Sequence, residues 1–222
     1  MNLLPFVLNY VFVAVVFLVS ISFHEFSHAY ISYKLGDPTA KNMGRLSLNP
    51  FKHIDAFGAI MMLIARIGWA KPVPINPMYY KDRKKGTLLV SLAGPLSNIL
   101  LAFIFAFPLV YISSRYNLRN ISVWNIKSIL LTLSYMFIHL NLNLAVFNLI
   151  PVPPLDGSKI FGAILPARQY YKMLEYENYM VIGLMLIIFM FSKQFGAVLS
   201  MITQPLETTI ITIASTIINI FI

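Results

Sequence analysis

The chain has 222 residues, of which 58% are hydrophobic and 11% are charged, and its mean hydropathy is +0.74. This composition excludes an ordinary soluble domain of this length and indicates an integral membrane protein. The net charge of +9 does not indicate nucleic acid, because the cations lie in short loops between apolar segments, where cations normally set membrane topology. Because there is no Cys, disulfides and thiolate metal sites are excluded.

Apolar segments that can form membrane spans, which need about 20 residues, recur along the chain. The first lacks a basic leading region and is longer than the core of a secretory signal, so we expect it to remain as a helix of the mature protein. We predict a single all-α polytopic membrane domain over residues 1–222, with about five to six transmembrane helices. The predicted spans are 5–33, 88–112, 128–150, 178–192 and 205–222.

The apolar run at 54–67 is too short to span comfortably and has basic residues on both sides. If it does not cross, 13 of the 17 Lys and Arg residues fall on one side of the membrane and 4 on the other. If it crosses, the two sides become nearly equal. The positive-inside rule therefore favours a re-entrant segment in a multi-pass protein of the cell membrane, with the loop 34–86 cytoplasmic and the N-terminus outside.

Two short stretches of this loop have distinct patterns. The sequence "GRLSLNP" at 44–50 alternates polar and apolar residues between Gly44 and Pro50, which predicts a small β-hairpin or edge strand at the cytoplasmic membrane surface. The sequence "GWAKPVPINP" at 68–77 contains three prolines after Ala70, which predicts an extended, irregular connector.

The first span contains "HEFSH" at 24–28. On a helix, His24 and His28 lie one above the other on one face, which is the geometry that binds a zinc ion. Glu25 projects about 100° away from His24, close enough to reach a water at the metal. Because ionisable groups at membrane depth are costly and mark functional sites, we predict that this face turns inward to a zinc site.

A catalytic zinc site needs a third protein ligand and one open position. Asp156, directly after the 128–150 span, is the strongest candidate, because the other acidic residues lie in the loop 34–86, beside a span or near the outer face. His24 lies ten residues before Lys34, or about 15 Å from the cytoplasmic helix end. The prolines ahead of Asp156 unwind the chain, which is tolerated at membrane depth only beside a cavity or under protein. We expect one wet pocket on the cytoplasmic side.

These motifs resemble the site-2 protease family of intramembrane zinc metalloproteases, especially its compact prokaryotic members without a PDZ or CBS domain. The resemblance covers about residues 10–165. It rests on "HEFSH", "AGPLSN" at 93–98 and "NLIPVPPLDG" at 148–157, together with "GDPTAKNMGRLSLNP" and "GWAKPVPINP". Ser27 and Ser158 stand where the family often has Gly.

The resemblance implies that His24, His28 and Asp156 bind one Zn²⁺ per chain, that Glu25 is the general base, and that Asn148 helps to hold the substrate or the developing oxyanion. A structural role of Asn148 at its helix end is the alternative. Zinc lowers the pKa of bound water from its ordinary value towards about 7 and polarises the scissile carbonyl.

The function predicted from these residues is zinc-dependent hydrolysis of a peptide bond within or near a transmembrane segment, near the cytoplasmic side. The expected partners are a transmembrane protein substrate and the lipid bilayer, with no nucleic acid. An extended substrate segment could pair with Leu46–Leu48 by strand addition. The alternatives are a metal-ion transporter that uses the same His and Asp residues, which would have little need of Glu25, and a catalytically silent protein that binds membrane clients.

Overall fold

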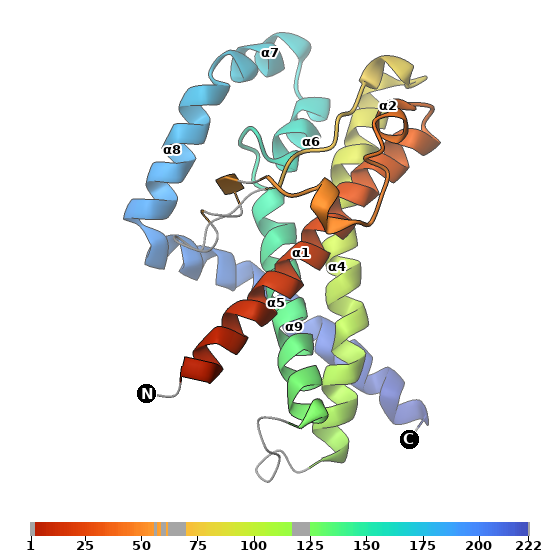
Figure 1. The fold of residues 1–222 in the computed structure, drawn as a ribbon. Helices are drawn as coiled ribbons and strands as arrows, with labels where there is room; N and C mark the ends of the chain where they lie inside the picture. Colours follow the sequence, from red (N-terminus) through yellow and green to blue (C-terminus); the bar gives the residue numbers. More distant parts are fainter. Residues whose placement is uncertain (1–2, 56, 59–60, 62–69, 117–124, 222) are drawn as a thin grey trace.

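The computed structural model describes residues 3–55, 57–58, 61, 70–116 and 125–221. Its main elements are long helices that cross one another in a bundle (Figure 1). Four of them are long and apolar enough to cross a membrane. These helices are α1 (Leu3–Lys34), α4 (Arg83–Arg115), α5 (Ile126–Asn148) and α9 (Ser192–Phe221).

A bent pair of helices supplies a possible fifth span. Helix α7 (Ala167–Glu175) meets α8 (Glu177–Met190) at an angle of 63°. The described residues therefore give four spans, which is fewer than the five to six expected from the sequence, or five if the bent pair counts as one span. The shorter elements are α2 (Thr39–Asn42), η1 (Pro50–Lys52), η2 (Pro77–Tyr79) and α6 (Asp156–Ile164).

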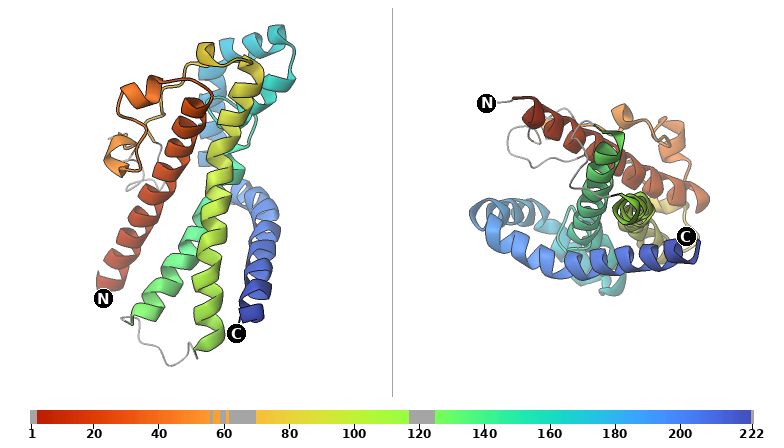
Figure 2. Two further views of the ribbon diagram at one scale, coloured as in Figure 1. Left: turned by 90° about the vertical axis from the view of Figure 1, so that its right-hand side faces the viewer. Right: turned by 90° about the horizontal axis from the view of Figure 1, so that it is seen from below.

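Helix α4 lies at the centre of the bundle, with α1 on one side and α9 on the other (Figure 2). It also contacts α5 and α6. Where α4, α5 and α9 meet, the buried core includes three alanines, which let the helix backbones approach closely. This core consists of Ala102, Ala106, Ile138, Leu142, Ile210 and Ala214.

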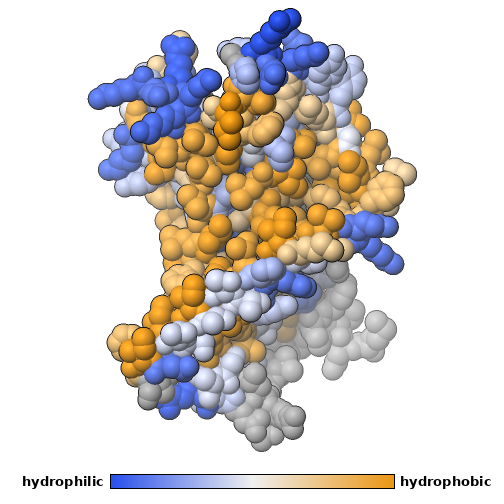
Figure 3. All heavy atoms as spheres, turned by 180° about the vertical axis from the view of Figure 1, so that it is seen from behind, coloured by the Kyte–Doolittle hydropathy of each residue, from blue (hydrophilic) through white to orange (hydrophobic). Residues whose placement is uncertain are grey.

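The surface agrees with a membrane protein. Seen from behind, hydrophobic residues cover most of the middle of the molecule, and hydrophilic residues gather at the end where α4 begins (Figure 3). An apolar surface of this extent is stable only against lipid or another protein. The chain is therefore an all-α, multi-pass membrane protein.

The predicted β-hairpin or edge strand at Leu46–Leu48 is wrong. These residues form bends after a turn at Gly44, whose φ is +65°. The local backbone bonds to side chains instead of a neighbouring strand, because Ser47 Oγ accepts from Asn49 N and Asn49 Oδ1 accepts from Phe51 N. Within the described part of the chain, the only β pairing is an isolated bridge between Ile54 and Ala70.

The predicted re-entrant segment at 54–67 lies mostly outside the described residues. The predicted connector is confirmed over its described part. Residues 71–76 are extended and without regular structure, and η2 follows them at Pro77.

The alanines of the central core give a test of this packing. We expect Ala106→Leu to lower the free energy of unfolding by about 1–3 kcal/mol, because the larger side chain must be forced between α4 and its neighbours. Reversible unfolding in mixed detergent micelles measures this change. Ala197→Leu on the exposed face of α9 is the control and should change stability little. Equal effects of the two substitutions would contradict the packing.

Candidate active site

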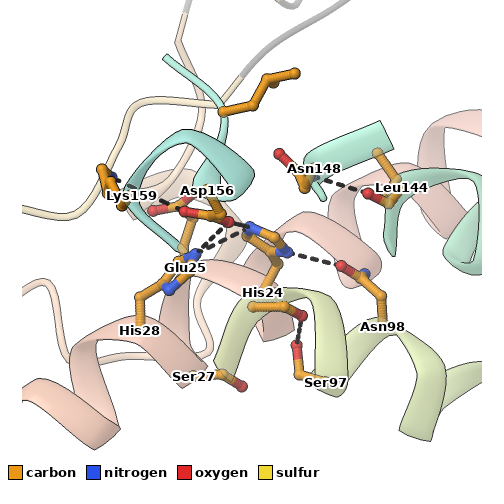
Figure 4. A network of polar contacts seen from close by, with 12 residues as sticks. His24, Glu25, Ser27, His28, Ser97, Asn98, Leu144, Asn148, Asp156 and Lys159 are labelled. Atoms are coloured by element: carbon orange, nitrogen blue, oxygen red, sulfur yellow. Dashed lines mark hydrogen bonds and ion pairs between the residues drawn. The ribbon is translucent and has the colours of Figure 1, made fainter. Parts of the chain in front are cut away.

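Three polar side chains from distant parts of the chain meet inside the bundle (Figure 4). His24 Nε2 lies 3.1 Å from Asp156 Oδ2, and His28 Nε2 lies 3.0 Å from the same oxygen. The two Nε2 atoms are 3.0 Å apart. All three side chains are buried. Two imidazoles and one carboxylate, with their donor atoms facing one point, match the donor set of catalytic zinc sites.

The remaining ring nitrogens are fixed by acceptors. His28 Nδ1 lies 2.7 Å from the backbone oxygen of Val90, which can only accept a hydrogen bond. His24 Nδ1 lies 2.7 Å from Asn98 Oδ1. Each Nδ1 therefore donates its proton, and the lone pair of each neutral ring is left on Nε2, where a metal would bind. Such bonds also set the orientation of the rings.

A chain of buried polar side chains supports His24 from behind. Asn98 donates through Nδ2 to Asn141 Oδ1 at 2.7 Å, which assigns the other amide atom of Asn98 as the acceptor for His24. Asn141 donates in turn to Ser20 Oγ at 2.8 Å and to the backbone oxygen of Phe137 at 2.8 Å. Every amide group in this network has a partner, so it fixes one arrangement of α1, α4 and α5.

Gly94 leaves the space in front of the two imidazoles. A Cβ atom at this position would lie 2.4 Å from His28 Nε2 and 2.5 Å from His24 Cε1. Any other residue would fill the cradle between the donor atoms, which is the observation expected if an ion sits there. The residues present therefore fit a zinc ion.

Asp156 reaches the site because α5 stops shortly before it. Pro151, Pro153 and Pro154 cannot continue a helix, and α6 begins at Asp156 itself. Gly157 lets this turn close tightly, since a Cβ there would lie 2.3 Å from the backbone oxygen of Leu149. The carboxylate of Asp156 is thus carried to the imidazoles by a short, closely packed loop.

Glu25 lies beside the candidate ligands but does not join them. Its Oε2 accepts a hydrogen bond of 2.8 Å from the backbone N–H of Val73 in the connector. Its carboxylate is buried and lines a cavity of about 220 Å³ together with His24, His28 and Asp156. The arrangement leaves Glu25 free to exchange a proton with a molecule in that cavity.

The connector is held in place at both ends. Asn76 N donates to Asp37 Oδ2 at 2.7 Å, and Asp37 also accepts from Ser32 Oγ on α1 at 2.8 Å. At the other end, Arg45 Nη2 donates to the backbone oxygen of Lys71 at 2.7 Å. Asp37 is completely buried. These anchors fix the position of Val73, and through it the position of Glu25.

Asn148 lines the same cavity from the end of α5. Its Nδ2 donates to the backbone oxygen of Leu144, 3.0 Å away in its own helix (Figure 4). The amide therefore lies near the candidate ligands, and one of its groups is bound within α5.

The family model of peptidase family M50 matches residues 116–192 of the chain. This part contains Asp156 but not the two histidines. YwhC of Bacillus subtilis (strain 168), which is named as a candidate zinc metalloprotease, is 43% identical over 168 residues, or 76% of this chain and 75% of YwhC. The chain belongs to peptidase family M50. This confirms the resemblance to site-2 proteases, and the protein is a zinc metalloprotease.

Other relatives of this M50 protein are longer. Zinc metalloprotease MJ0392 of Methanocaldococcus jannaschii is 32% identical over 166 residues, which are 73% of this chain and 38% of MJ0392. Rip2 of Mycobacterium tuberculosis (strain H37Rv), named as a candidate zinc metalloprotease, is 31% identical over 177 residues, covering 72% of this chain and 64% of Rip2. The chain thus spans less than two thirds of these two proteins. No solved structure matches it significantly.

The sequence motifs located His24, Glu25, His28, Asn148 and Asp156, and the structure brings all five to one cavity. The support of His24 by Asn98 was missed. The sequence did contain a signal for this support. Asn98 lies inside an apolar span, one helical turn after Gly94, and a second Asn, Asn141, lies inside the next span. Only the packing of α4 against α5 shows that these two amides meet.

The Asn98 network gives a test that does not alter a candidate ligand. We expect Asn98→Leu to weaken zinc binding by about 10- to 100-fold, the usual cost of removing a partner that orients a ligand. Competition with a chromogenic chelator measures the zinc dissociation constant, and circular dichroism checks the fold.

Asn143→Leu is the matched control, because the Asn143 amide donates to the backbone of its own helix at His139. It should bind zinc like the wild type. Wild-type zinc affinity in Asn98→Leu would contradict the assigned support.

Proposed function

We propose that this M50 protein is an intramembrane zinc endopeptidase that hydrolyses a peptide bond within or near a transmembrane segment of a membrane protein. The observation that carries the proposal is the burial of His24, Glu25 and His28 in α1, which is itself a candidate membrane span. A loop of a soluble protein cannot reach reacting groups at this depth in the membrane. Its substrate must bring a peptide bond into the bilayer.

The roles that we propose follow from the geometry of the site. His24, His28 and Asp156 hold the zinc ion, and Asn98 and Val90 keep the two imidazoles in the tautomer that can bind it. When bound, zinc supplies a Lewis acid that polarises the scissile carbonyl and makes water acidic near neutral pH. Side chains of the protein transfer the protons and hold the substrate.

Glu25 is the general base. It accepts the proton of the attacking water and hands it to the leaving amine as the peptide bond breaks. The Val73 N–H bond to Oε2 orients the carboxylate. Asn148 lines the same cavity as the connector and is our candidate for contacting the substrate carbonyl.

The substrate must be extended to fit. A helical segment has its peptide groups bonded internally, so it must unwind locally before water can attack its carbonyl. The extended connector, including Pro72, Val73 and Ile75, forms one wall of the cavity. This wall is apolar, which suits hydrophobic side chains of a membrane segment.

We also propose that the site faces the cytoplasmic half of the membrane. His24 lies ten residues, or about 15 Å, from the end of α1 at Lys34. At the same end, α4 begins with the basic sequence "RKK" at 83–85. Positive-inside asymmetry therefore supports a cytoplasmic position for this end and an outside position for the N-terminus.

Replacement of the base tests the mechanism. We expect Glu25→Gln to keep wild-type zinc content and to lower cleavage of a transmembrane substrate by about 10²- to 10⁴-fold, the usual contribution of a general base. Zinc analysis and gel-based cleavage of a panel of transmembrane segments measure the two quantities. Glu175→Gln, at an exposed position on α7, is the control and should cleave normally.

Unchanged cleavage by Glu25→Gln would refute its role. Loss of zinc together with cleavage would mean that Glu25 holds the metal. Cleavage of soluble peptides alone, with no transmembrane segment cut, would refute the proposed substrate class.

The absence of natural cysteines allows a direct test of orientation. We introduce one cysteine at Lys84, near the start of α4, or at Ile126, at the start of α5, where both residues are exposed. A membrane-impermeant maleimide added to intact cells should label the cysteine at position 126 and should reach the one at position 84 only after permeabilisation. The opposite pattern would reverse the assigned orientation.

A further inference from the structure

A second hollow lies between α1 and α4, separate from the zinc cavity. It is an open groove of about 530 Å³ with an almost wholly apolar lining. Three of its leucines are between 41% and 57% exposed, so nothing in the described part of the chain covers them. The α4 wall consists of Leu89, Leu92, Leu96 and Leu100, and Ser27 and Ile31 belong to the α1 wall.

The groove has no route to the reacting groups. Its α1 wall is the helix face that carries Ser27, whereas His24 and His28 face the other cavity, and the two hollows share no lining residue. Gly94 and Asn98 of α4 lie against the imidazoles, and neither residue lines the groove. A peptide in the groove therefore cannot meet Glu25, which argues against a substrate segment as its occupant.

The length of the groove matches one leaflet of a bilayer. Leu89 and Leu100 are eleven residues apart on a continuous helix, which is about 16 Å. Half of the hydrocarbon core is about 15 Å thick. A groove of this depth suits an acyl chain, whereas a transmembrane helix would need a groove about twice as long.

The mouth of the groove is positively charged on both walls. Lys34, on the α1 wall, lies 5.4 Å from the ring centroid of Tyr30, which also lines the groove. Lys85 lies one turn before Leu89 on the same face of α4 and is exposed. Asp82, at the start of α4, caps the helix by accepting from the backbone N–H of Lys85.

We propose that this groove is a binding site for an anionic phospholipid. The acyl chain lies along the leucines of α4, and the headgroup phosphate lies between the Lys34 and Lys85 ammonium groups. Two cations set above an apolar groove distinguish this site from a flat lipid-facing surface, which any lipid would cover equally. Because the lipid contacts both helices that position the candidate zinc ligands, it stabilises their pairing.

Lipid binding by the purified full chain tests the proposal. Native mass spectrometry counts bound phosphatidylglycerol and phosphatidylcholine with identical acyl chains, and a thermal scan records the unfolding midpoint with each lipid. The wild type should retain one phosphatidylglycerol in preference to phosphatidylcholine, and phosphatidylglycerol should raise the midpoint more. Equal retention of the two lipids, or equal midpoints, would overturn the proposal.

Two variants assign the lipid to the groove. Lys34→Gln with Lys85→Gln should weaken phosphatidylglycerol binding by about tenfold or more, since each cation near an anionic lipid contributes measurably. Leu96→Trp keeps both charges but fills the groove, and it should lower retention of the lipid as well. Circular dichroism and gel filtration confirm that the variants are folded.

A matched control removes two cations at exposed positions on α7, outside the groove, with Arg168→Gln and Lys172→Gln. This variant should bind phosphatidylglycerol like the wild type. Equal loss in the control would show that net charge, and not the groove, holds the lipid. Wild-type binding by both groove variants would place the lipid elsewhere. Either result overturns the proposal without bearing on proteolysis.

Discussion

Two imidazole nitrogens and one carboxylate oxygen lie within 3.1 Å of one another in the interior of the bundle. Neutral imidazoles facing a carboxylate with their lone pairs repel it, so a proton or a metal cation between the donor atoms is needed to make this approach favourable. Much of the surrounding structure serves this approach: Gly94 leaves the space, and the proline run delivers Asp156. Because metal binding and folding share one free energy, the zinc ion contributes to the stability of the helix arrangement as well as to the chemistry.

The support behind His24 comes from side chains on helices. Asn98 and Asn141 are completely buried, and their amides connect α1, α4 and α5 through bonds of 2.7 and 2.8 Å. In an apolar interior such bonds have no water to replace them, so they hold one geometry. The imidazole rings are therefore oriented before a substrate arrives, which a hydrolytic site requires.

The sequence was most informative where chemistry depends on local spacing. The i, i+4 pair in "HEFSH" has one geometry on any helix, and the cluster of three prolines before Asp156 disfavours a helix there, so these residues were predictable. The prediction of a strand at Leu46–Leu48 was wrong, because an alternating pattern does not show that a partner strand is present. Here side chains such as Asn49 accept the backbone hydrogen bonds locally. The meeting of Asn98 with Asn141, and of Glu25 with Val73, depends on contacts between distant segments that periodicity does not encode.

The hydrogen bond between Glu25 and the Val73 backbone joins the carboxylate that we propose as general base to the extended connector at 71–76. Asp37 holds one end of the connector and Arg45 the other, and neither residue is a candidate zinc ligand. A change in the connector or in its two anchors would therefore move Glu25 while the three candidate ligands keep their contacts. Different segments of the chain thus position the carboxylate and hold the metal, so turnover and zinc affinity can be altered separately.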